Sequence, residues 1–156
     1  MEKKEIKIVG LDLDGTLLTD KKELLPYTKN VIKEALKNGT VVLVATGRPW
    51  TGVPEELREL PGMDYALTAN GARIIETRTG KVLEEHLLSK EAAKKAIAIG
   101  RKYDTLLEVY FDGQGYAQKD EIAQVRKYHK NPNMWDYFLR TRIAVDRLED
   151  LLDEKE

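Results

Sequence analysis

The sequence predicts an α/β fold in which a partial, parallel sheet of the Rossmann type is followed by an inserted α+β module. Up to Asn70, short runs of branched apolar residues alternate with helical patterns, which is typical of βαβ units in a doubly wound sheet. After Gly71 the expected strands come in pairs joined by turns, which is typical of an antiparallel module. This change of pattern predicts a boundary within residues 80–88.

The amino-terminal part is expected to contain buried strands separated by helices. Pro26 suits the first turn of a helix, because its missing N–H would have no helical partner there. Asn38-Gly39 is a typical helix end. In chain order, we predict a strand over residues 6–11, a helix over 26–37, a strand over 40–45, a short helix over 54–60 and a strand over 65–69.

The carboxyl-terminal part is expected to combine hairpins with helices. Thr79-Gly80 and residues 112–115 suit hairpin turns, and Ser89 suits a helix N-cap. In chain order, we predict strands over residues 72–76 and 81–86, a helix over 90–103, strands over 105–111 and 116–118, a helix over 120–129, a strand over 142–145 and a helix over 146–152.

The composition is that of a globular domain and argues against several classes of function. The chain of 156 residues is 42% hydrophobic, which is enough to build a core. Lys+Arg 26 and Asp+Glu 27 leave a net charge of -1, so neither nucleic acid nor a membrane surface is an expected partner. The absence of cysteine excludes disulfides and thiolate chemistry. With no signal peptide and no apolar run near the ~20 residues of a membrane span, we expect a cytoplasmic protein.

Asp12 and Asp14 stand two residues apart at the end of the first predicted strand. Carboxylates so close repel each other and are costly to desolvate, and a divalent cation such as Mg²⁺ would relieve both problems. An ionised Asp12 could then attack phosphorus, while Asp14 gives a proton to the leaving oxygen and later takes one from water. The alternatives are a polar turn without chemistry and an EF-hand calcium loop, for which Gly15 falls two positions too early and the final Glu is missing.

Three segments together resemble one enzyme family. Residues 12–18, Asp-Leu-Asp-Gly-Thr-Leu-Leu, resemble motif I of the haloacid dehalogenase (HAD) superfamily. Residues 45–48, Ala-Thr-Gly-Arg, resemble its motif II as found in the Cof-type phosphatases, which carry a type IIB cap. Residues 68–72, Thr-Ala-Asn-Gly-Ala, are similar to the segment that precedes the cap in that branch. The segments occur in the family's order and at its usual separations, so the set is far more specific than any one of them.

This resemblance implies a HAD-like Rossmannoid core and a phosphoric monoester hydrolase. The substrate would be a small phosphorylated metabolite, such as a sugar phosphate or a phosphorylated cofactor. The reaction would pass through an aspartyl-phosphate at Asp12, with Asp14 as general acid/base. Mg²⁺ would be bound at Asp12 and Asp14, the latter offering its main-chain carbonyl.

Four further residues are implied to lie near the phosphoryl group. By the resemblance, the Thr46 hydroxyl would hydrogen-bond that group and the Gly47 amide would add to its cradle. Arg48 would face the phosphate or bridge to the cap, and Asn70 would orient the substrate or the loop. Simpler roles remain open: a Ser/Thr turn for Thr46, an exposed salt bridge for Arg48 and an Asn-Gly turn for Asn70.

The resemblance also divides the chain into domains. Residues 1–80 would form the amino-terminal half of the core, and residues 81–156 would form part of the cap. Such a cap covers the site, excludes water and selects the substrate. Candidate cap-lining groups, for each of which packing or surface exposure is the favoured role, are Tyr110, Tyr116, His129, Trp135 and Arg142.

Two elements of the family pattern do not occur in the 156 residues: the Lys of motif III and the acidic Gly-Asp segment of motif IV. Three explanations are open: a chain truncated within the cap, a compact variant that uses residues of another subunit, and a binding relic without catalysis. The alternative function is a catalytically incomplete fragment that binds phosphate or metal and oligomerises. Because the first strand would lie at an exposed edge of the sheet, that edge is the expected surface for a homo-oligomer.

Overall fold

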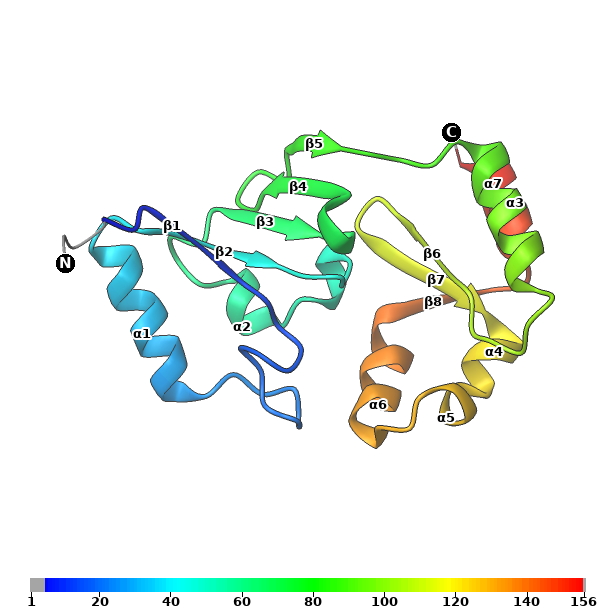
Figure 1. Cartoon of the computed structure of the whole chain (residues 1–156), viewed down its shortest axis with the longest axis horizontal. Helices are drawn as coiled ribbons and strands as arrows, with labels where there is room; N and C mark the ends of the chain where they lie inside the picture. The colour runs from blue at the N-terminus through cyan, green and yellow to red at the C-terminus, as the bar shows by residue number, and fades with distance from the viewer. Residues whose placement is uncertain (1–4, 156) are drawn as a thin grey trace. The chain divides into compact units, whose positions relative to one another are not determined.

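A computed structural model describes residues 5–155 of the chain (Figure 1). The chain forms two compact units: unit 1 ends at Glu85, and unit 2 begins at His86. None of the helices in the described range combines the length and the hydropathy that a membrane span requires.

Unit 1 is built on a five-stranded sheet whose strands lie in chain order. β1 (Ile8–Leu11), β2 (Val41–Ala45) and β3 (Tyr65–Thr68) are parallel. β4 (Arg73–Glu76) and β5 (Val82–Glu85) extend the sheet beyond β3 as antiparallel strands. The predicted parallel strands and the first predicted hairpin are thereby confirmed. Since parallel strands end at one edge of a sheet, the residues that follow β1, β2 and β3 lie along that edge.

Helices and short turns connect the parallel strands. α1 (Pro26–Lys37) begins with Pro26 in its first turn, and the N–H of its C-cap Asn38 donates to the carbonyl of Glu34. α2 (Glu55–Arg58) is shorter than predicted. The 3₁₀ turns η1 (Trp50–Gly52) and η2 (Ala69–Gly71) follow β2 and β3.

Both helices cover the same face of the sheet (Figure 1). Each crossover moves one strand further in the same direction, and right-handed crossovers in one direction place their helices on one side. A second helical layer requires a reversal of strand order. The order β1 to β5 contains none, so the doubly wound arrangement that the sequence predicted is not found in the described part of unit 1. The buried core residues are Leu13, Leu18, Leu24, Ile32, Val42, Val44, Val53, Leu57, Leu60, Met63, Ala66 and Ile75.

The opposite face of this sheet is partly open to solvent. Ile8 and Val41, which are paired across β1 and β2, are 63% and 37% exposed, and Tyr65 on β3 is 38% exposed. Val42 and Val44, whose side chains point to the helix side, are buried. Among the described strands β1 pairs with β2 alone, so its other edge presents unpaired backbone groups.

Unit 2 has a three-stranded sheet with helices on both faces. One face packs against α3 and α7, through Ile97, Leu148 and Leu152. The other packs against α4 to α6, through Val125 and Phe138. In chain order the elements are α3 (Lys90–Gly100), β6 (Glu108–Phe111), β7 (Gln114–Gln118), α4 (Lys119–Ala123), α5 (Val125–Tyr128), α6 (Pro132–Thr141), β8 (Arg142–Val145) and α7 (Leu148–Glu154).

Several expectations for unit 2 are wrong. The module is not purely antiparallel: β8 runs parallel to β7, because α4 to α6 carry the chain back across the sheet before β8 begins. β7 starts at Gln114, since Asp112 and Gly113 both have positive φ and form a two-residue hairpin turn. The predicted helix over 120–129 breaks at Gln124 into α4 and α5.

Side-chain caps begin two helices of unit 2, of which the sequence analysis predicted α3 and missed α6. Ser89 caps α3 as predicted, because its hydroxyl accepts the N–H of Ala92 at 3.2 Å. α6 was not predicted, although Asn131 caps it by accepting the N–H of Asn133 at 3.0 Å and Pro132 lies in its first turn. The cap and the proline together are the signal that identifies this helix.

Candidate active site

Asp12 is the first residue after β1, in a loop that folds back on itself. The Leu17 N–H donates to the Asp12 carbonyl at 3.2 Å, and the Leu18 N–H donates to the Leu13 carbonyl at 2.9 Å. Leu13 and Leu18 are buried in the core of unit 1. Because the apolar residues anchor the loop from below, the carboxylates of Asp12 and Asp14 remain on its exposed side.

The Asp12 carboxylate is oriented within its own loop. The Thr16 hydroxyl donates to Asp12 Oδ2 at 2.9 Å. This hydrogen bond fixes the side chain through one oxygen. The arrangement suits a nucleophile, whose attacking atom must be held in place.

Asp14 is held by two cations. The Arg48 guanidinium donates through Nε to Oδ2 and through Nη2 to Oδ1, both at 2.7 Å. The Lys22 ammonium donates to Oδ1 at 2.8 Å. Burial opposes the ionisation of Asp14, but these hydrogen bonds and positive charges outweigh it, so the pKa of the carboxyl lies below its ordinary value of 3.8. As held, Asp14 is an ionised carboxylate, and its lowered pKa makes it a weaker base than a free aspartate.

Arg48 is buried and lies against Asp14. Its side chain is 7% exposed, and Nη1 donates to the Gly52 carbonyl at 2.8 Å. The salt bridge that the sequence left open is thus present as a two-pronged pair, with Arg48 buried and the Asp14 side chain 37% exposed. Three donors of the guanidinium are committed to Asp14 and Gly52, and its phosphate-binding role remains a prediction.

Hydrogen bonds join the loops that follow β2 and β3. The Asn70 N–H donates to the Thr46 carbonyl at 3.1 Å, and the Ala69 N–H donates to the Arg48 carbonyl at 3.0 Å. Thr46 is buried, and its hydroxyl accepts the Arg48 N–H at 3.1 Å, as in a Ser/Thr turn. The hydroxyl still has its own proton to donate, so the turn and a phosphate contact are compatible.

Asn70 lies directly against Gly47. A Cβ on Gly47 would lie 2.7 Å from Asn70 Oδ1, so a larger residue there would require the Asn70 side chain to move. Ala69, Asn70 and Gly71 all have positive φ, which makes η2 a left-handed turn. Such a backbone is costly for Ala69 and tolerated by Asn and Gly. The Asn-Gly turn that the sequence left open is thus present, and a substrate-orienting role for Asn70 remains a prediction.

The donor set of this loop suits a hydrated Mg²⁺ ion. Magnesium is typically bound by one or two carboxylates, keeps several waters and contacts substrate phosphate. Asp12 offers a carboxylate on the exposed side of the loop, whereas the Asp14 carboxylate is engaged by Arg48 and Lys22. Within the described residues, no three His, Cys, Asp or Glu side chains gather in one place to form a metal cage.

Lys22 is the residue of this cluster that the sequence analysis missed. Its polar neighbours in residues 19–23 indicate a turn, but nothing in the sequence says which lysine points inward. Its direction depends on a positive φ of 64° at Lys22 itself.

The candidate cap-lining residues lie within the packing of unit 2. The Arg142 guanidinium is enclosed by the rings of Tyr110, Tyr137 and Phe138. Trp135 Nε1 donates to the His129 carbonyl at 2.6 Å. Tyr116 packs against the cluster of α3 and α7. These contacts support the packing roles that the sequence favoured.

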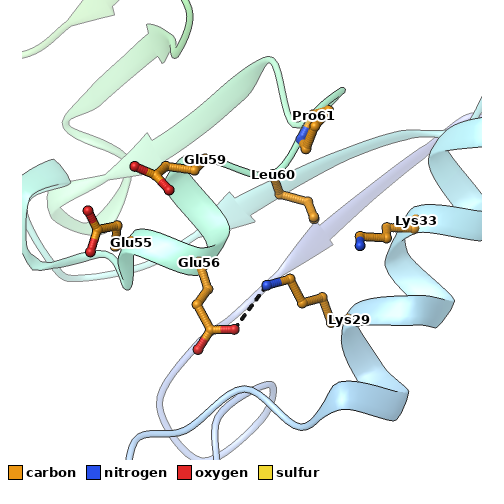
Figure 2. A pocket seen from close by; sticks show the side chains of 7 residues that line it. All are labelled: Lys29, Lys33, Glu55, Glu56, Glu59, Leu60 and Pro61. Atoms are coloured by element: carbon orange, nitrogen blue, oxygen red, sulfur yellow. Dashed lines mark hydrogen bonds and ion pairs between the residues drawn. The ribbon is translucent and has the colours of Figure 1, made fainter.

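A groove of about 320 Å³ lies between α1 and α2 (Figure 2). Lys29 and Lys33 line its α1 side, and Lys29 Nζ reaches across to Glu56 at 3.0 Å. None of the predicted site residues lines it. The groove is therefore separate from the carboxylate site.

The chain matches a known family over most of its length. The sequence pattern of haloacid dehalogenase-like hydrolases matches residues 9–150. The HMP-PP phosphatase of Serratia proteamaculans is 29% identical over 125 residues, which are 79% of this chain and 45% of that protein. The chain spans less than half the length of the first curated relatives that it matches.

Solved structures have the same fold. A haloacid dehalogenase-like hydrolase from B. subtilis matches 97% of this chain and 58% of its own, with a TM-score of 0.78 and 22% identity. The HAD subclass IIB sugar phosphatase BT4131 matches 96% of this chain and 55% of its own, with a TM-score of 0.72 and 22% identity. The family match and the shared fold confirm the resemblance that motifs I and II predicted, and the chain belongs to the haloacid dehalogenase-like hydrolases.

Proposed function

We propose that this chain carries the nucleophilic half of a magnesium-dependent phosphatase that hydrolyses a small phosphorylated metabolite. The observation that carries the proposal is the placement of Asp12, whose carboxylate is oriented by Thr16 at the end of β1. Thr46 and Asn70 follow β2 and β3 at the same edge of the sheet. Membership of the hydrolase family supports the same conclusion.

The proposed reaction has two displacements at phosphorus. Asp14 is ionised in the free chain, so it must first take up a proton from solvent; Asp12 then attacks, the bond from phosphorus to the substrate oxygen breaks, and Asp14 gives that proton to the leaving oxygen. Water then attacks the aspartyl-phosphate and gives a proton back to Asp14. The bond from phosphorus to Asp12 breaks, and inorganic phosphate leaves.

Mg²⁺ would be held by the Asp12 carboxylate and the main-chain carbonyl of Asp14, and it would offset negative charge on the transferring group. The Thr46 hydroxyl and the Gly47 amide would hydrogen-bond the same group. Arg48 acts through Asp14, whose carboxylate it holds, more directly than on the phosphate itself.

We propose residues 1–80 as core and 81–156 as the cap that selects the substrate; this cap comprises unit 2 and, from the sheet of unit 1, β5. One relative is named an HMP-PP phosphatase and one solved structure a sugar phosphatase, which supports a sugar phosphate or a phosphorylated cofactor as substrate. Both are small anions, and a chain with a net charge of -1 must bind them through local groups.

The proposal is tested by phosphate release from para-nitrophenyl phosphate and from a panel of sugar phosphates. We expect hydrolysis with Mg²⁺, and loss of at least about tenfold when a chelator removes the ion, because the metal supplies charge stabilisation worth several kcal/mol. Activity that is unchanged by the chelator would contradict the metal dependence. A pure chain without any hydrolysis would favour the alternative of a binding fragment.

The exposed edge of β1 favours a second proposal, that two copies of the chain pair through it. Ile6 and Ile8 are 66% and 63% exposed beside the unpaired backbone of this strand. In an antiparallel pairing centred on Ile6, Lys7 of one copy would lie opposite Glu5 of the other, on both sides of the two-fold axis. The two Ile6 side chains and the opposite charges would thus match in the segment that leads into β1, whereas Ile8 of each copy would lie opposite Lys4 of the other.

Self-association is tested by sedimentation at increasing protein concentration. We expect a dimer for the parent chain and a monomer for Ile8→Lys, because a lysine on an edge strand blocks pairing. Leu83→Lys on β5 is the matched control, since Leu83 is 44% exposed at the opposite edge of the same sheet. A parent chain that sediments as a monomer at all concentrations would contradict the proposal, and so would an Ile8→Lys dimer.

A further inference from the structure

The loop between Leu18 and α1 is closed by three hydrogen bonds. The Thr19 N–H donates to the Glu23 carbonyl at 3.0 Å, and the Lys22 N–H donates to the Thr19 carbonyl at 2.8 Å. The Glu23 N–H donates to the Thr19 hydroxyl at 3.2 Å. These bonds fix the backbone on both sides of Lys22, so the direction of its side chain is set by the turn.

Lys22 adopts a backbone conformation that lysine seldom takes. Its φ is 64°, in the left-handed region that favours glycine and asparagine. The side chain is only 18% exposed, although an ammonium group gains most from full hydration. Both unfavourable features occur in the residue whose Nζ lies 2.8 Å from Asp14 Oδ1.

Asp14 is thereby fixed from two separate parts of the chain. Arg48, from the segment after β2, grips both oxygens in one plane. Lys22, from the loop before α1, adds a third donor on Oδ1 and closes that side of the carboxylate. Two cations that meet on one carboxylate leave it a single side-chain orientation.

From this geometry we propose that Lys22 is a positioning residue for Asp14, aimed at it by the left-handed turn of residues 19–23. The holding of Asp14 stands on the contacts alone. Its consequence for turnover rests on the proposed phosphatase function, in which Asp14 gives a proton to the leaving oxygen. That proton transfer matters little for a phenolate, which leaves readily, and matters greatly for an alkoxide.

The kinetic test compares Lys22→Met on two substrates, para-nitrophenyl phosphate and an alkyl ester such as glycerol phosphate. We expect kcat to fall about 10–100-fold on the alkyl ester, the usual effect of losing a group that orients a functional side chain, with little change in KM. On para-nitrophenyl phosphate we expect a loss below about threefold, because a phenolate leaves without much help from a proton donor. Lys22→Arg should restore part of the difference, and Lys21→Met, which removes the exposed neighbouring lysine, is the matched control.

If Lys22→Met lowered kcat equally on both esters, or changed KM alone, Lys22 would not support proton transfer by Asp14. A loss of the same size in Lys21→Met would lead to the same conclusion, since the effect would then belong to the charge of the loop. The ratio between the two esters is the informative readout, because a loop that merely became less stable would lower both rates together.

A second test does not depend on activity. Lys22→Met, Asp14→Asn and the double variant form a cycle in urea unfolding, where two groups in contact should be coupled by about threefold or more in the unfolding equilibrium constant. Additive effects would overturn the positioning role whether or not the chain hydrolyses either ester. A coupled pair in a chain that hydrolyses neither would support Lys22 as the residue that holds Asp14 and would reject the phosphatase proposal.

Discussion

Asp12→Asn is expected to lower the rate of phosphate release by at least about 10³-fold, because loss of a nucleophile leaves only binding and electrostatic effects. Asparagine has nearly the shape of aspartate and still offers an oxygen to the Thr16 hydroxyl, which lies 2.9 Å from Asp12 Oδ2. The loop should therefore keep its conformation, and the free energy of unfolding should change little. Initial rates with para-nitrophenyl phosphate and Mg²⁺ measure the effect.

Asp20→Asn is the matched control, since Asp20 is an exposed carboxylate of the same loop outside the site. It should leave the rate within about twofold of the parent, as expected for a surface position away from the chemistry. Treatment with hydroxylamine during turnover should convert the aspartyl-phosphate to a hydroxamate at Asp12, detectable in the peptide that contains residues 12–18. A rate that survives Asp12→Asn, or a hydroxamate at another carboxylate, would contradict Asp12 as the nucleophile.

Arg142→Leu is expected to destabilise unit 2 by about 3 kcal/mol, because it leaves the carboxylate of Glu108 without its ion-pair partner. The Arg142 side chain is 4% exposed and donates through Nε to Glu108. It also contacts Tyr110 and Tyr137, whose hydroxyls lie 3.2 and 3.4 Å from its terminal nitrogens. Burial and the charge of Glu108 raise the pKa of Tyr110 to about 12, so this phenol is neutral at neutral pH.

Urea unfolding measures the loss, with Trp135 as the reporter in a Trp50→Phe background. Arg140→Leu is the matched control: Arg140 lies exposed on α6, two residues before Arg142, where its Nε donates to the carbonyl of Asp136, and its loss should cost less than about 1 kcal/mol. Replacing Glu108 as well should recover part of the stability, because no buried charge then lacks a partner. A cost for Arg142→Leu no larger than that of the control would contradict the role of this pair.

Much of unit 1 was predictable because local signals and long-range order agree there. Pro26 and Asn38 mark the two ends of α1, and branched runs mark β1 to β3. The single helical layer was not predicted, because alternating strands and helices do not reveal the direction of each crossover. In unit 2, β7 begins earlier than expected, since Asp112 takes a positive φ that its side chain tolerates but does not require.

The sequence predicted which residues lie in the candidate site better than it predicted which side chains contact one another. Motif spacing places Asp12, Thr46 and Asn70 at the ends of successive parallel strands, which is where they lie. The partners of Asp14 were beyond such reasoning, because a sequence pattern does not say where a long side chain is directed. For Arg48 the sequence left a phosphate contact, a bridge to the cap and a salt bridge open without naming Asp14, and Lys22 was not considered at all. Both contacts depend on the three-dimensional course of the chain.

The chain-order arrangement of the sheet in unit 1 has a consequence for how this unit forms. Each described strand of this sheet pairs only with strands adjacent to it in the sequence, so no pairing among them requires a strand that is synthesised later out of order. A ribosome releases the chain from its amino terminus, and β1 to β5 could then assemble in order of emergence while later residues are still being synthesised. The loop that carries Asp12 would be shaped early in that sequence, before the residues of unit 2 exist.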